Sequence, residues 1–131
     1  MGLDMYAFAT KAKLKNEVDF SETNLKGEEI HYWRKHPNLH GWMQNLYDDK
    51  GGKSDSFNGD CVVLTNDDLD NLEHDLKQWD LPQTSGFFFG QDENNEDELK
   101  DDLEFVAKAR EAIKEGKTVY YTSWWQYEKY I

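Results

Sequence analysis

A single proline separates two hydrophobic patterns in the stretch IHYWRKHPNLHGW at residues 30–42. Before Pro37 the side chains alternate in character, which is typical of a strand because successive residues point to opposite faces. Pro37 cannot lie in a central strand, but it fits the first turn of a helix, where its missing N–H is not needed. Beyond it, apolar residues recur at helical spacing, at Leu39, Trp42, Met43 and Leu46. The stretch therefore predicts a strand, a tight corner and a helix.

The predicted corner concentrates groups that bind anions. Arg34, Lys35 and His36 meet the N-terminus of a helix there, and its free backbone N–H groups also favour negative charge. Aromatic side chains nearby could stack on a planar ring. We therefore expect a site for a small anionic or nucleotide-like ligand, formed by Arg34, Lys35, His40, Trp33, Trp42, Tyr6 and Trp124. The alternative is that Arg34 and Lys35 are solvated or paired with neighbouring acids.

The histidines of this stretch do not indicate a metal site. His36 and His40 are four residues apart, but Pro37 places His36 at or before the helix cap, where it need not share a face with His40. No cysteine or acid joins them at a recognised metal-binding spacing. Neither a GxGxxG nor a complete GxxxxGK[ST] motif occurs in the chain. We therefore predict no bound metal and no cofactor.

Length and composition limit the class of protein. The 131 residues suit a single domain, residues 1–131, and 15% of them are aromatic, so burial of large side chains can support a core. No apolar run is long enough to span a bilayer, and the only cysteine, Cys61, has no partner for an internal disulfide. We therefore expect a cytoplasmic protein that makes no membrane contact.

The net charge of −12 argues against direct binding of a nucleic acid, because its phosphates would be repelled. The same charge supports a second hypothesis, an acidic interaction protein that blocks a partner by imitating phosphate charge. Its surface would lie at residues 92–104, where acids gather at the front of a helix. A third hypothesis is an enzyme acting on a phosphorylated small molecule, with His40 as acid/base and Asp4 as its orienting partner. We expect binding rather than catalysis.

Hydrophobic periodicity predicts an α+β domain with a mixed or antiparallel sheet of about five strands and with about three helices. Strands are expected at residues 3–10, 29–35, 61–65, 86–89 and 118–125. Helices are expected at residues 37–47, 66–79 and 95–115, and loops at residues 11–29 and 48–60. The helices should cover one face of the sheet, whose strand order these patterns do not determine.

Two of the predicted helices carry conventional end signals. Thr65, followed three residues later by Asp68, predicts a capping box at the start of the second helix. Gly116 is expected just after the end of the third helix. Arg110 falls within the apolar stripe of that third helix. It either extends to solvent at the helix edge or reaches a carboxylate or an anionic ligand.

Four short stretches of the chain form a distinctive set. They are MGLDMY at residues 1–6, YWRK at 32–35 with His40 and Trp42 after it, SGFFFG at 85–90, and YYTSWW at 120–125. Together they resemble a family of small uncharacterised proteins from bacteriophages and bacteria, whose members open with MGLDMY. The resemblance implies a phage setting, and hence a host protein as the partner of the second hypothesis. Some members are labelled phosphoglycerate kinase, but this chain is too short for a two-domain kinase, so neither activity nor catalytic residues are implied.

Overall fold

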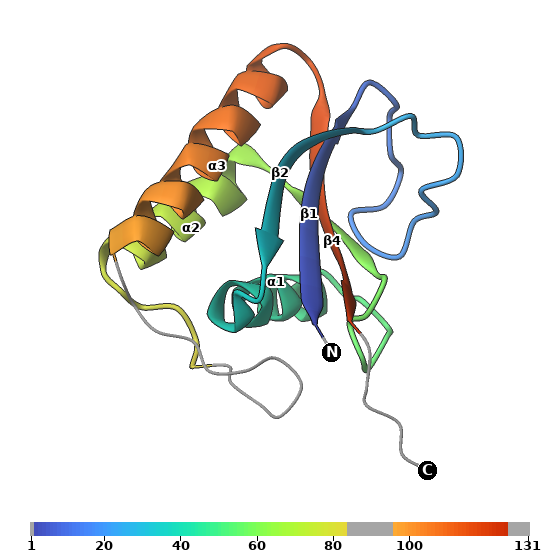
Figure 1. Ribbon diagram of the computed structural model, residues 1–131. Coiled ribbons are helices and arrows are strands. Elements are labelled where there is room, and N and C mark those ends of the chain that lie inside the picture. The colour runs from blue at the N-terminus through green and yellow to red at the C-terminus, as the bar shows by residue number, and fades with distance from the viewer. Residues whose placement is uncertain (1, 84–95, 126–131) are drawn as a thin grey trace.

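The chain folds into an antiparallel sheet with helices on one of its faces (Figure 1). A computed structural model describes residues 2–83 and 96–125, which form four strands and three helices. The predicted α+β class is confirmed, and the sheet is antiparallel throughout this part. The fifth strand expected at residues 86–89 lies outside the described residues. None of the described helices is long and apolar enough to cross a membrane.

Each described element begins and ends within two residues of its predicted range. The strands are β1 (Leu3–Thr10), β2 (Glu28–Arg34), β3 (Cys61–Leu64) and β4 (Thr118–Trp125). The helices are α1 (Pro37–Asp49), α2 (Asn66–Lys77) and α3 (Glu96–Lys114). The strand order is β2-β1-β4-β3, so the first and last strands of the chain lie side by side in the centre of the sheet.

Alternation along β1 gives the sheet two different faces. Its odd-numbered residues are buried and its even-numbered residues are partly exposed as far as Phe8. We call the buried side the inner face and the other side the outer face. Because antiparallel partners share a face, the register assigns the side chains of β2 and β4 to the same two faces.

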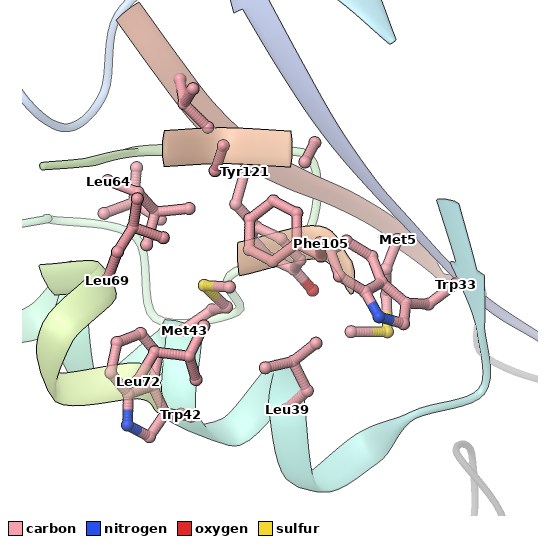
Figure 2. Packing of buried hydrophobic residues seen from close by; sticks show 14 of the residues in the cluster. Met5, Trp33, Leu39, Trp42, Met43, Leu64, Leu69, Leu72, Phe105 and Tyr121 are labelled. Atoms are coloured by element: carbon pink, nitrogen blue, oxygen red, sulfur yellow. The ribbon is translucent and has the colours of Figure 1, made fainter. Parts of the chain in front are cut away.

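The inner face packs against all three helices to form the main core. Figure 2 shows the indole ring of Trp33 from β2 beside Phe105 from α3, with Leu39 and Met43 of α1 below them. The ring centroids of Trp33 and Phe105 are 4.9 Å apart in an edge-on arrangement, which is favourable for aromatic pairs. Tyr121 of β4 closes this cluster from the sheet side. Large rings thus supply much of the core of a strongly polar chain.

The long loop between β1 and β2 packs against part of the outer face (Figure 1). Phe20 packs edge-on against Tyr120 of β4, with ring centroids 5.3 Å apart, and Leu25 joins the same small cluster. The loop also pairs with the edge of β3, where the N–H of Val63 donates to the carbonyl of Glu17 at 2.8 Å. No other described segment covers the part of the outer face near the start of β1.

An irregularity interrupts the pairing of β1 with β2, which is an edge strand. Ala7 pairs with His31, but the next residue, Phe8, pairs with Glu29. Ile30 is therefore an extra residue in β2, as in a β-bulge. On the N-terminal side of Ile30, odd- and even-numbered residues of β2 therefore point to the opposite faces from those further along the strand.

The expected end signals of α2 and α3 are both present. At the start of α2, Thr65 accepts from the N–H of Asp68 at 3.2 Å, and Asp68 accepts from the N–H of Thr65 at 2.9 Å. The predicted capping box is therefore confirmed. After α3, Gly116 has a φ of +87°, the left-handed conformation that glycine adopts at helix ends.

The loop at residues 48–60 contributes to the core, which its polar composition did not indicate. Phe57 is fully buried, and its ring stacks on Tyr121 with centroids 5.9 Å apart. Gly52 lies directly against the buried ring of Tyr47, so closely that an added Cβ would be 2.2 Å from a ring carbon. This loop is therefore packed rather than simply solvated.

We predict that Gly52→Ala destabilises the protein by about 3 kcal/mol, because the buried ring of Tyr47 cannot move away from the new methyl group. Gly51→Ala is the matched control. Gly51 has open space around it but a φ of +91°, so its substitution should cost only about 1 kcal/mol. Urea unfolding of both variants measures the difference, and equal losses would contradict the steric explanation.

Candidate functional site

The sheet divides the seven residues that were expected to form one ligand site. Alternation along β2 sends Trp33 to the inner face and Arg34 to the outer face. Tyr6 and Trp124 share the outer face with Arg34, whereas His40 and Trp42 are buried on the helical side. Lys35 is exposed in the corner after β2. The structure therefore does not bring the seven side chains together as one site.

His40, the candidate acid/base, is enclosed in the core. Its side chain is 1% exposed, and Nδ1 lies 2.8 Å from the hydroxyl oxygen of Tyr121. Burial lowers the pKa of His40 to about 4, so the imidazole is neutral at pH 7. Asp4, the expected orienting partner, lies on the opposite face of the sheet. The acid/base pair of the third hypothesis is not assembled in this arrangement.

The two buried tryptophans of the expected site tie helices to the rest of the fold. Trp42 of α1 donates its indole N–H to Asp75 of α2 at 2.9 Å. Trp33 of β2 donates to Oδ1 of Asp102 in α3 at 3.0 Å. Figure 2 shows both indole rings at the boundary of the apolar cluster. The two tryptophans therefore hold α1 against α2 and β2 against α3.

Asp102 is a buried carboxylate at the centre of a polar cluster. It is 2% exposed and accepts from Trp33 and, through Oδ2, from Nε2 of His36 at 2.7 Å. Two donors compensate for the loss of water around the carboxylate. Asp102 points inward, so it does not belong to the acidic surface expected at residues 92–104, of which residues 92–95 lie outside the described part of the chain. The neighbouring Asp101 also faces β2, with Oδ1 3.2 Å from Nε2 of His31.

A small cavity lies beside this polar cluster, between the end of α2 and the start of α3. Its volume is about 20 Å³, and its lining includes His36, Asp102, Glu98 and Trp79. A cavity of this size has room for roughly one water molecule, so it is far too small for a nucleotide. Among the described residues, no group of three histidine, cysteine or acidic side chains could hold a metal ion. The cavity therefore does not replace the expected ligand site.

Arg34 remains available for an anion. It lies at the end of β2, exposed on the outer face, with Nη2 close to Gly2. Within residues 2–83 and 96–125, no carboxylate forms an ion pair with it. The second arginine, Arg110, contrasts with it, because it pairs with Asp70 at 2.8 Å and with Glu73 at 2.9 Å. Arg110 is thus paired with two carboxylates of α2 at the surface and does not reach inward.

Exposed aromatic side chains share the outer face with Arg34. Tyr32 is 43% exposed and Trp124 is 54% exposed, and the rings of Tyr6 and Tyr32 lie with centroids 5.3 Å apart. These side chains come from the three adjacent strands β2, β1 and β4. We call Tyr6, Tyr32, Arg34 and Trp124 the outer-face patch. Tyr32 was not among the expected site residues, although it lies two positions before Arg34 in β2 and so points to the same face.

Asp4 lies within the outer-face patch and is oriented by it. The strand register places Asp4 opposite Arg34 on one side and opposite Trp124 on the other. The hydroxyl of Tyr32 donates to Oδ1 of Asp4 at 2.5 Å. This hydrogen bond is the main reason that the pKa of Tyr32 is raised, with burial and the negative charge of Asp4 adding to it. The phenol therefore stays protonated and keeps the carboxylate in place.

No family model, no curated protein and no solved structure matches the chain. What the outer-face patch can bind is therefore inferred from its geometry alone. A guanidinium can hold a phosphate or carboxylate through two parallel hydrogen bonds, and exposed aromatic rings can stack on a planar group. The patch combines both capacities on one accessible surface.

We predict that Asp102→Ala lowers the free energy of unfolding by about 3 kcal/mol, because it leaves the buried donors of Trp33 and His36 without their acceptor. Asp97→Ala, at an exposed position of the same helix, is the control and should change stability by less than about 0.5 kcal/mol. Chemical denaturation measures both. Equal effects would show that Asp102 behaves as an ordinary surface acid.

The lowered pKa of His40 predicts a pH-dependent loss of stability. In the unfolded chain His40 binds a proton near its usual pKa of 6.5, whereas in the folded protein it does so near 4. Its contribution is therefore complete above pH 6.5 and is lost as the pH falls from 6.5 to 4. Between pH 7 and 5 the loss should be about 2 kcal/mol.

The comparison protein is His40→Gln, which cannot titrate in this range. Urea unfolding at pH 7 and at pH 5 should show a smaller loss in His40→Gln than in the parent protein, by about 2 kcal/mol. Carboxylates contribute equally to both proteins, so the difference isolates His40. An identical pH dependence in the two would contradict the burial of a neutral imidazole.

Proposed function

We propose that the protein binds a small anionic ligand that carries a planar ring, of the nucleotide type, on its outer-face patch. The observation that carries this proposal is the state of Arg34, which is exposed and has no ion pair with a described carboxylate. It shares its face with three aromatic side chains, two of them well exposed. The guanidinium would hold the anionic group, and the rings would stack on the planar part.

The overall charge favours a small ligand over a polymer. A long nucleic acid would bring many phosphates toward a protein with a net charge of −12, whereas a mononucleotide brings only one or a few. Lys35 follows Arg34 directly and is also exposed, so the end of β2 offers two cations to one anionic group. Local attraction can therefore outweigh the general repulsion for a small anion.

The expected site residues divide into two roles in this proposal. Arg34, Tyr6 and Trp124 would touch the ligand, together with Tyr32 and, at the end of β2, Lys35. Trp33, His40 and Trp42 are buried and hold the scaffold beneath the sheet. Trp33 matters most, because its contact with α3 fixes the orientation of β2 and so directs the neighbouring Tyr32 and Arg34 outward.

Titration of the protein with nucleoside monophosphates should raise its melting temperature, and added salt should reduce the rise because the phosphate contact is electrostatic. Arg34→Ala should abolish the rise, whereas Arg34→Lys should retain part of it, since a lysine supplies charge but no bidentate fork. Lys100→Ala, which removes an exposed cation from α3, is the matched control and should bind normally.

The same titrations can contradict the proposal in two ways. The parent protein could show no change in melting temperature with any nucleoside monophosphate at millimolar concentration. Alternatively, Arg34→Ala and Lys100→Ala could respond as the parent does. In the second case binding would occur away from the outer-face patch. Melting of the unliganded variants checks that both are folded, which is expected because both positions are exposed.

A further inference from the structure

We infer that the outer-face patch selects guanine over other bases through the carboxylate of Asp4. This inference rests on the proposed function and specifies the ligand of the same site. It follows from the position of Asp4 between a cation and an exposed ring, and from the hydrogen bond that orients its carboxylate. Arg34 and Trp124 account for the anion and the ring, but neither distinguishes one base from another.

The strand register defines the arrangement of these three side chains. Asp4 of β1 is the direct partner of Arg34 in β2 and of Trp124 in β4, so all three lie in one row across the outer face. Side chains that oppose each other on neighbouring strands are separated by roughly 5 Å at Cβ. A base stacked on Trp124 would therefore direct an edge toward Asp4. The ribose lies on the opposite side of a purine from this edge, so the phosphate of the same ligand would reach Arg34 with the ribose folded back over the base, in the syn conformation.

The carboxylate of Asp4 is held in one orientation. Tyr32 donates to Oδ1 at 2.5 Å, whereas no described residue donates a hydrogen bond to Oδ2. The pKa of Tyr32 is raised, so its hydroxyl remains a donor at neutral pH. An ionised carboxylate only accepts hydrogen bonds, so the ligand edge that faces it must donate.

Guanine has the base edge that fits an acceptor of this kind. Its N1–H and its exocyclic amino group are adjacent donors, and together they can reach both oxygens of one carboxylate. Adenine places the acceptor N1 beside its amino group, and uracil places carbonyl oxygens on both sides of N3–H. An acceptor that faces a buried or stacked carboxylate is left unpaired, which is the usual basis of strong discrimination between ligands.

The test is a calorimetric titration of the parent protein with GMP, AMP and IMP under identical salt conditions. GMP should bind at least about tenfold more tightly than AMP, the discrimination typical of one bidentate base contact. IMP keeps the N1–H but lacks the amino group, so its affinity should lie between the two. Intrinsic fluorescence provides a second readout, because a stacked base should quench the exposed indole of Trp124, one of the five tryptophans.

Asp4→Asn is the decisive variant, because the amide has nearly the shape of the carboxylate but presents a donor as well as an acceptor. It should lose the preference for GMP over AMP while it keeps the salt-sensitive, Arg34-dependent binding of both. Tyr32→Phe should retain the carboxylate but not its orientation, and should lower the preference by a smaller factor. Melting of the unliganded variants confirms that each is folded.

The outcomes separate this inference from the function on which it rests. Equal affinity for GMP and AMP in the parent protein, lost for both in Arg34→Ala, would overturn the role of Asp4 and leave the binding function standing. A GMP preference that persists in Asp4→Asn would overturn it as well. If no nucleotide binds to the parent protein, both the inference and the proposed function fail.

Discussion

The hydrogen bonds to the buried carboxylate of Asp102 fix the orientation of β2 and, with it, the residues that β2 directs outward. They join the middle of α3 to Trp33 in β2 and to His36 in the corner before α1, across 69 and 66 positions of the chain. A buried charge of this kind is stable only when its donors are in place, so the contact demands one orientation of β2. With Trp33 directed inward, Arg34 and Tyr32 must face outward. The orientation of the outer-face patch is thus fixed from the buried side of the sheet.

Local patterns were sufficient to locate the elements, because each depends on residues close together in the chain. The alternation before Pro37, the capping box at Thr65 and the glycine after α3 all act within a few residues, and all three are present. The arrangement of the strands depends instead on packing between distant segments. Nothing in the pattern of β1 indicates that β4 would be its neighbour. Phe57 was missed for a similar reason, since one aromatic residue in a polar loop does not indicate burial.

The sequence grouped the residues of the candidate site by chemical type, and the structure divides them between the two faces of the sheet. The stretch around Arg34 does hold the cation and one of the rings, but neighbours in sequence lie on opposite faces of a strand. Trp33 and His40 therefore became core residues, while Tyr32 took the exposed position. Asp102 was expected at the surface because it follows a run of acids, and its burial depends on Trp33 and His36, which no local pattern connects to it. Knowledge of the strand register would have resolved most of these assignments.

The loop that crosses the outer face sets an upper limit on what can lie there. Phe20 and Leu25 cover Tyr120 and the neighbouring part of β3, which leaves the region near the start of β1 open among the described residues. An extended chain, whether peptide or oligonucleotide, would meet this obstruction after a short distance along the strands. Under the proposed function, the loop would therefore favour single small molecules over polymers.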